Sequence, residues 1–122
     1  MASFREPFPI MYTDDVRRAA RFYVETLGFE LTYRYPPEDD EEPSFVYLRV
    51  GDHGIGIGTP TPQNTGRAFE LCVYADSADA AAARLRAAGC DEVMAPRDEP
   101  WGERRTYFRD PDGNLLHVAQ TL

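Results

Sequence analysis

The chain is poor in cysteine and has no long hydrophobic run, and each shortage excludes a class of protein. Among its 122 residues, Cys72 and Cys90 stand at no metal-binding spacing. This favours reduced, packed thiols over a zinc motif or a disulfide scaffold, although two cysteines could in principle pair. No apolar run approaches the ~18 residues of a membrane span, and the N-terminus has no basic region followed by an apolar one. We therefore expect a cytoplasmic protein.

Basic residues are also scarce. Thirteen of them face 21 acidic residues, which gives a formal net charge of −8. This balance disfavours nucleic acid and anionic membranes as partners and permits a cationic ligand. The acidic run at residues 38–42 is flanked by prolines and predicts an irregular segment between two strands. It is either a solvated loop or an electrostatic lip at the mouth of a pocket.

Motifs for nucleophilic catalysis and for phosphate binding are missing. No serine lies in a Gly-x-Ser-x-Gly elbow, and neither cysteine has a histidine at motif spacing. The glycine-rich stretch 51–58 is not followed by a Lys-Ser or Lys-Thr pair and opens no helix, so a phosphate cradle is disfavoured. Its glycines suit a turn and a strand that passes close to another backbone.

The clearest local motif is present near the C-terminus, where Asp110, Pro111, Asp112, Gly113 and Asn114 stand between two apolar runs. Proline pre-sets φ at the first corner of a turn, and glycine accepts a positive φ. We expect the Asp112 side chain to accept a hydrogen bond from nearby backbone. The segment thus predicts two strands joined by a tight turn.

The chain contains the same pattern twice. One helical pattern opens at Asp15 and ends at Gly28, and a second opens at Ser77 and ends at Gly89. The two glycines are half a chain length apart, and each is placed to end its helix in a left-handed cap. A short apolar run precedes each helix and three strand-like runs follow it. A period of half the chain indicates a duplicated module.

The predicted fold class is α+β, with two βαβββ modules that form a concave mixed sheet. We expect a single domain over residues 1–122, with a first module at 1–59, a connector at 60–66 and a second module at 67–122. The first module has a helix capped by Asp14 or Asp15, and the second a helix over residues 77–88. The predicted strands are residues 8–12, 29–35, 45–50, 55–58, 67–74, 92–95, 104–109 and 114–120.

This order of elements resembles the vicinal-oxygen-chelate superfamily, which includes glyoxalase I, extradiol dioxygenases, fosfomycin-resistance enzymes and bleomycin-resistance proteins. The resemblance covers nearly the whole chain. Residues 8–11 and Pro100, Trp101 and Gly102 look most like the bleomycin-resistance branch. The other motifs that carry the resemblance are Asp15-Val16, Phe22-Tyr23, residues 27–29, 70–73 and 84–89, and the segment 103–117. The resemblance implies a homodimer with a ligand groove between subunits.

In the enzymes of this superfamily, His, Gln or Glu ligands come from the first and fourth strand of each module. Carried to this sequence, the first-module positions fall on Phe8 or Pro9 and within residues 55–58, which offer no ligand atom. The second-module positions fall on Glu70 and His117. An enzymatic divalent-metal site needs roughly three protein ligands, so we expect no cofactor. If a divalent metal is bound, the resemblance makes Glu70 and His117 its ligands.

Aromatic side chains are the better candidates for a binding site. Trp101 and Phe45 could hold a planar ligand ring between them, with Tyr35 and Tyr47 nearby, although Tyr47 is more typical of a core or interface residue. Glu70 and the acidic run would supply charge. Alternation gives each of their strands one face that carries Glu70 or His117. If both of these faces line the ligand groove, Glu70 and His117 lie together inside it. They would form part of the ligand pocket or a structural hydrogen-bonded pair.

The interpretation that follows is a metal-free protein that binds and sequesters a cationic or aromatic small molecule, such as an antibiotic. Its site residues would be Trp101, Phe45, Glu70, His117, Tyr35 and Tyr47, with no catalytic residue. The alternative is a metal-dependent lyase, isomerase or dioxygenase of the same superfamily. A third alternative is a binding protein for an ordinary metabolite.

Overall fold

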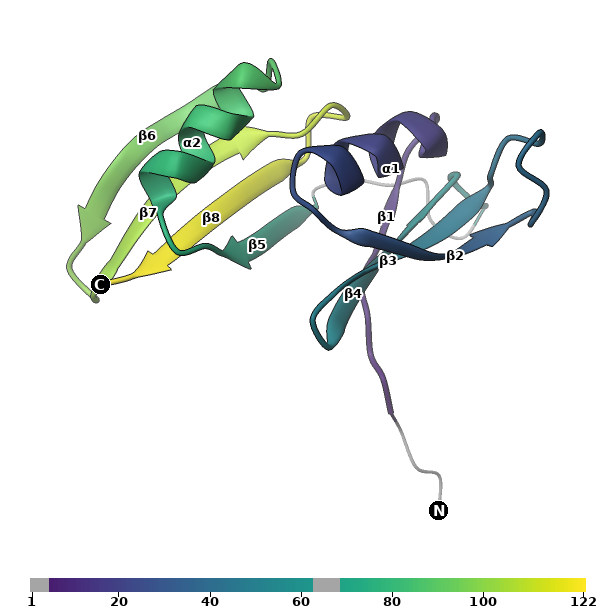
Figure 1. Ribbon diagram of the computed structural model, residues 1–122, viewed down its shortest axis with the longest axis horizontal. Coiled ribbons are helices and arrows are strands. Elements are labelled where there is room, and N and C mark those ends of the chain that lie inside the picture. Colours follow the sequence, from purple (N-terminus) through teal and green to yellow (C-terminus); the bar gives the residue numbers. More distant parts are fainter. Residues whose placement is uncertain (1–4, 63–68) are drawn as a thin grey trace. The chain divides into compact units, whose positions relative to one another are not determined.

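The computed structural model describes residues 5–62 and 69–122. They fall into two compact units, Met1–Gly66 and Arg67–Leu122. Each unit contains a four-stranded mixed sheet and one helix (Figure 1). Residues 63–66 of the predicted connector and residues 67–68 of the predicted strand after it lie outside the described residues.

The first unit has the strand order β1-β4-β3-β2. Its last strand lies parallel to its first, and the other pairs are antiparallel. The elements are β1 (Ile10–Tyr12), α1 (Val16–Glu25), β2 (Glu30–Tyr35), β3 (Phe45–Val50) and β4 (His53–Gly58).

The second unit repeats this topology with the order β5-β8-β7-β6, and its first and last strands again pair in parallel. Its elements are β5 (Glu70–Tyr74), α2 (Ala78–Ala87), β6 (Glu92–Glu99), β7 (Glu103–Arg109) and β8 (Leu115–Thr121). The predicted pair of βαβββ modules is confirmed.

One helix covers one face of each sheet, and this is where each core lies. Helix α1 packs on β3, β4 and β2, and helix α2 packs on β7, β6 and β8. In the second unit the fully buried side chains include Ala82 and Leu85 of the helix and Phe108 and Leu116 of the sheet. Along each strand the alternate side chains point to the opposite face, which the helix leaves open. That open face carries the polar and aromatic residues.

The helix ends follow the predicted signals. The Asp15 carboxylate accepts a hydrogen bond from the Arg18 N–H at 3.0 Å, and the Ser77 hydroxyl accepts one from the Ala80 N–H at 3.0 Å. These N-caps satisfy amide groups that have no partner inside the helix. Past the other end of each helix, Gly28 and Gly89 have φ of 78° and 82°, which confirms the left-handed caps.

The turn between β7 and β8 is present, and the Asp110 side chain accepts hydrogen bonds that hold it. Its buried carboxylate receives the N–H groups of Asp112 and Asn114 at 2.9 and 2.8 Å, and the Asn114 side-chain amide at 3.0 Å. Asp110 comes directly after the strand, so its carboxylate reaches the amides of the turn that follows.

Two boundaries differ from the prediction. Strand β6 runs on from residue 95 through Pro96 to Glu99, because β6 is an edge strand and its pairing is irregular between Met94 and Arg97. A proline is tolerated at such a place, since no ladder hydrogen bond is required of it. His53 belongs to β4 rather than to the turn, because Gly51 and Asp52 alone connect β3 to β4.

We expect Asp110→Ala to lower the free energy of unfolding by about 1–3 kcal/mol, because amides of the turn lose their acceptor next to a buried strand end. Urea unfolding followed by circular dichroism measures this change. Asp91→Ala is a suitable control, since Asp91 is an exposed carboxylate in the same unit. An equal, small effect of both substitutions would contradict the role assigned to Asp110.

Candidate functional site

The open face of the second unit carries a connected set of polar and aromatic side chains. Register places Cys72 of β5, His117 of β8 and Tyr107 of β7 in one row across the sheet. Alternation puts every second residue of these strands on the same face. The set therefore includes Glu70, Cys72 and Tyr74 of β5, Glu103, Arg105 and Tyr107 of β7, and His117 of β8.

His117 lies at the centre of this row and is only 5% exposed. Its Nδ1 atom is 3.3 Å from the Glu70 Oε2 atom, and its Nε2 atom is 3.8 Å from the Cys72 sulfur. The Tyr107 ring stacks on the imidazole, with centroids 4.6 Å apart and planes 21° apart. The predicted contact between Glu70 and His117 thus exists, on the face of the sheet that was expected. Glu70 itself stays half exposed.

A second centre on this face is the Glu103 carboxylate. It accepts hydrogen bonds from Trp101 Nε1, Tyr74 Oη and Arg105 Nε, each at 2.9 Å. The Arg105 guanidinium also lies 5.1 Å from the centroid of the Trp101 ring, within the range of a cation–π contact. Arg105 further donates to the Tyr107 hydroxyl at 3.2 Å. The indole is therefore held in one orientation although 59% of Trp101 is exposed.

These contacts change the proton affinities of three groups. Hydrogen bonds from Trp101, Arg105 and Tyr74 hold the pKa of Glu103 below its ordinary value, because they favour the charged form. The hydrogen bond to the Glu103 carboxylate raises the pKa of Tyr74, because it favours the neutral phenol. Burial raises the pKa of the Cys72 thiol, while the Arg105 charge acts in the opposite direction. Glu103 is thus an anion, and Cys72 a thiol, at neutral pH.

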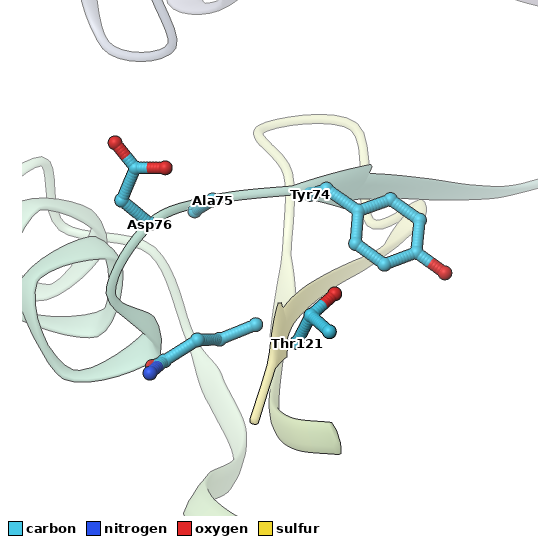
Figure 2. A pocket seen from close by; sticks show the side chains of 5 residues that line it. Tyr74, Ala75, Asp76 and Thr121 are labelled. Carbon is cyan, nitrogen blue, oxygen red and sulfur yellow. The ribbon is translucent and has the colours of Figure 1, made fainter. Parts of the chain in front are cut away.

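A hollow of about 280 Å³ lies where β5 ends. It is next to the network of hydrogen bonds that Glu103 accepts from Trp101, Tyr74 and Arg105. It is lined by Tyr74, Ala75, Asp76, Gln120 and Thr121. Figure 2 shows the Tyr74 ring and the Asp76 carboxylate at opposite ends of the hollow. None of the six predicted site residues lines it, and Tyr74 alone joins it to the network.

In the first unit, Phe45 and Tyr47 lie flat on their own sheet. A methyl group added at Gly56 would come within 2.8 Å of the Phe45 ring, and one added at Gly54 would collide with the Tyr47 hydroxyl. The β4 glycines therefore make room for rings as well as for the neighbouring backbone, since a methyl group at Gly54 would also come within 2.7 Å of the Leu48 carbonyl oxygen. Tyr35 is 57% exposed at the end of β2. Trp101 and Phe45 belong to different units, so a ring held between them stays a prediction.

The acidic run forms an exposed loop between β2 and β3. Arg17 of α1 pairs with Glu42 at 3.2 Å and donates to the carbonyl groups of residues 39 and 41. Arg34, which is in register with buried Val46 on the α1 side of the sheet, donates to the carbonyl groups of Pro36 and Glu41. Both arginines hold the loop from the helix side.

The donor set does not fit an enzymatic metal centre. Within residues 5–62 and 69–122, no group of three or more His, Cys, Asp and Glu side chains could hold a metal ion. Glu70 and His117 are the two donors at the positions that correspond to the ligands of the enzymes. Three protein ligands are the usual minimum for a catalytic zinc ion. The positions of the first unit that correspond by resemblance carry Phe8 and glycine-rich β4.

The comparisons with known proteins agree with this architecture. The family model for the Glyoxalase/Bleomycin resistance protein/Dioxygenase superfamily matches residues 7–118. The chain therefore belongs to this superfamily, and its two βαβββ modules are those of the vicinal-oxygen-chelate fold.

Several solved structures share the fold. TnmS3, an antibiotic binding protein from Streptomyces sp. CB03234, is 28% identical with a TM-score of 0.77, over 99% of this chain and 98% of its own. TioX from Micromonospora sp. ML1 has a TM-score of 0.81 at 24% identity, over 94% and 98%. A lactoylglutathione lyase from Agrobacterium tumefaciens has a TM-score of 0.73 at 23% identity, over 93% and 92%. The fold thus occurs in both binding proteins and enzymes.

Sequence reasoning missed Glu103, Arg105 and Tyr107. Their alternation along β7 was a usable signal, because residues two apart in a strand share a face. What could not be read was the row across the sheet, since register between β7 and β8 depends on the turn that joins them.

No helix in the described ranges is long and apolar enough to cross a membrane.

Trp101 is the single tryptophan of the chain, so its fluorescence reports the Glu103 network directly. We expect its emission to titrate with a midpoint below the ordinary glutamate value of 4.5, because the pKa of Glu103 is lowered. The stabilisation from this lowered pKa is present above the ordinary value and is lost as the pH falls through the lowered one.

In Glu103→Gln this acid transition of the emission should disappear. Far-UV circular dichroism over the same pH range separates it from acid unfolding. A transition that persists in the variant would show that another group controls the environment of Trp101.

Proposed function

We propose that this protein binds and sequesters a small molecule that contains a planar aromatic ring, without a metal ion. The observation that carries the proposal is the orientation of Trp101. Its ring is 59% exposed, yet Glu103 bonds its N–H and the Arg105 guanidinium lies against it. A large exposed ring is normally mobile. Held in this way, it loses little conformational entropy when a ligand stacks on it.

The charge on the same face favours a ligand with a cationic group. Arg105 and Arg97 are each paired with a carboxylate of their own strand, Glu103 and Glu99, at 2.8 and 2.7 Å. Glu70 contacts a histidine instead of an arginine and is half exposed. It is therefore the carboxylate best placed to meet a cation from solution, and the net charge of −8 acts in the same direction.

The comparisons support a binding protein of the bleomycin-resistance type. TnmS3, the antibiotic binding protein, shares 28% of its residues with this chain over nearly the full length of both. An antibiotic with a cationic, planar ring system would meet both requirements if it extends along β8, because register places Glu70 beside Leu115 and Glu103, next to Trp101, beside Thr121. Sequestration needs no catalytic residue, so the incomplete donor set around His117 is compatible with it.

The remaining candidates belong to the same proposal. Tyr35 is an exposed ring of the first unit, and Phe45 and Tyr47 lie on the open face of its sheet. They stay candidates for ring contacts with the ligand, as His117 of the second unit does for its polar contacts. The homodimer and the cytoplasmic location stay predictions.

One observation favours the alternative of a metal-dependent lyase, isomerase or dioxygenase. Glu70 and His117 lie in contact on adjacent strands, at the positions that the resemblance gives to metal ligands. Activity lost with a chelator and with His117→Ala would support this alternative. The shortage of a third donor among the described residues makes it the weaker candidate.

We expect Trp101→Ala to weaken binding of a cationic aromatic probe by about 1–3 kcal/mol, or roughly 5- to 150-fold in Kd, because one ring contact is lost. Isothermal titration calorimetry with bleomycin and with ethidium measures this change. Val93→Ala, at an exposed apolar side chain of β6, is the control and should leave Kd unchanged. Equal affinity of the wild type and Trp101→Ala, with the fold intact, would contradict the proposal.

A further inference from the structure

Three side chains of the second unit form a line that the sequence does not suggest. Cys72 and His117 are 45 positions apart, and the parallel pairing of β5 with β8 makes them direct neighbours. The Cys72 sulfur faces one ring nitrogen of His117 at 3.8 Å, and the Glu70 carboxylate faces the other at 3.3 Å. The sequence shows no histidine at motif spacing from either cysteine, and motif spacing does not detect such cross-strand contacts.

The two partners fix the tautomer of the imidazole. An ionised carboxylate only accepts hydrogen bonds, so the Nδ1 atom that faces Glu70 must carry the proton. The Nε2 atom then presents its lone pair to Cys72, whose S–H is the donor. This order of contacts is that of a catalytic triad. Cys72 has the place of the nucleophile, His117 that of the base, and Glu70 that of the group that orients the base.

The base cannot turn away from this geometry easily. His117 is 5% exposed, and the Tyr107 ring stacks on it at 4.6 Å. Tyr107 is in turn bonded by Arg105. By contrast, Cys72 is exposed, so a molecule from solution can reach its sulfur. A fixed base behind an accessible thiol is the arrangement that nucleophilic addition requires.

We propose that Cys72 is a nucleophile that adds to soft electrophiles of the α,β-unsaturated carbonyl class, with His117 as its general base and Glu70 as the residue that positions His117. The sulfur forms a bond to the β-carbon while the carbon–carbon π bond breaks and its electrons move to the carbonyl oxygen. The S–H proton passes to His117 Nε2 and then to the α-carbon. The thiol adds across the double bond, with no leaving group and no net oxidation.

Base assistance is the mechanism that the geometry assigns. The His117 Nε2 atom lies 3.8 Å from the Cys72 sulfur, in place to take the proton as the bond to carbon forms. The charged groups that act on Cys72 have opposite effects, because the Arg105 guanidinium favours an anionic sulfur and the Glu103 and Glu70 carboxylates oppose it.

The chain contains a matched control. Cys90 is its only other cysteine, and burial raises its pKa as well. The charged groups that act on Cys90 are the carboxylates of Asp110 and Asp91, which raise its pKa further. Cys90 therefore serves as the reference thiol that no described histidine contact is assigned to, and the His117→Gln variant isolates the contribution of His117.

The experiment measures alkylation by N-ethylmaleimide, an α,β-unsaturated carbonyl compound, in the full chain carrying Cys90→Ser or Cys72→Ser. Intact-mass spectrometry follows the rate between pH 6 and pH 9. An unassisted thiol reacts about tenfold faster per pH unit, because its thiolate fraction rises by that factor. We expect this slope for Cys90 and a distinctly shallower one for Cys72, with at least about a tenfold advantage for Cys72 at pH 7.

Two variants identify the base and its positioning residue, both made in the Cys90→Ser background. His117→Gln should give Cys72 the steep slope of an unassisted thiol. Glu70→Gln, at a half-exposed position, should leave the fold intact and make the slope steeper, which a purely structural role of Glu70 would not do. Thermal melting checks each fold.

Several outcomes would overturn the proposal. Equal slopes for Cys72 and Cys90 in the folded protein would do so without any His117 variant. A slope for Cys72 that Glu70→Gln does not change would remove Glu70 from the mechanism. A Cys72 rate that depends on added zinc or on a chelator would assign His117 to a metal instead. None of these results depends on the ligand bound at Trp101, so the test is independent of the proposed binding function.

Discussion

The parallel pairing between the first and last strand of each unit is the constraint on which the rest of the structure depends. In the second unit it joins β5 to β8 and brings residues some 45 positions apart into contact. A parallel pair cannot be closed by a hairpin, so the helix and two further strands must lie between its members. The intervening helix covers one face of the sheet. The two intervening strands extend the sheet and place further side chains beside the parallel pair on the other face. The Glu70–His117–Cys72 line is a direct product of this pairing.

The two units use one topology for different surfaces. On the open face of the first, Phe45 and Tyr47 lie over glycines of β4. On the open face of the second, the strand that corresponds to β4 carries His117, and its neighbours carry Glu70 and Tyr107. The glycines of β4 leave room for aromatic rings but offer no metal ligand. The imidazole of His117 in β8 offers a ring nitrogen that can take a proton. The two units share their topology and the helix on one face of the sheet, while the side chains on their open faces differ.

Much of the fold could be read from the sequence because its signals are local. Helix caps such as Ser77 and end signals such as Gly89 act within a few residues, and alternation fixes the face of each strand residue. That was enough to place Glu70 and His117 on one face. The partners of Trp101 could not be predicted, because they depend on how the side chains of Glu103 and Arg105 are oriented. Such orientations follow from cross-strand register and packing, which a single sequence does not record.

The Glu70 carboxylate has two possible uses, and they compete. A cationic ligand that binds Glu70 would compete for the carboxylate that contacts His117, and the proposed role of Glu70 in positioning His117 depends on that contact. A neutral electrophile leaves the Glu70–His117 contact at 3.3 Å undisturbed. If both proposals hold, the face of the second unit would distinguish ligands by charge. A cation would occupy Glu70, whereas a neutral electrophile would meet the Cys72 thiol with the Glu70–His117 contact intact.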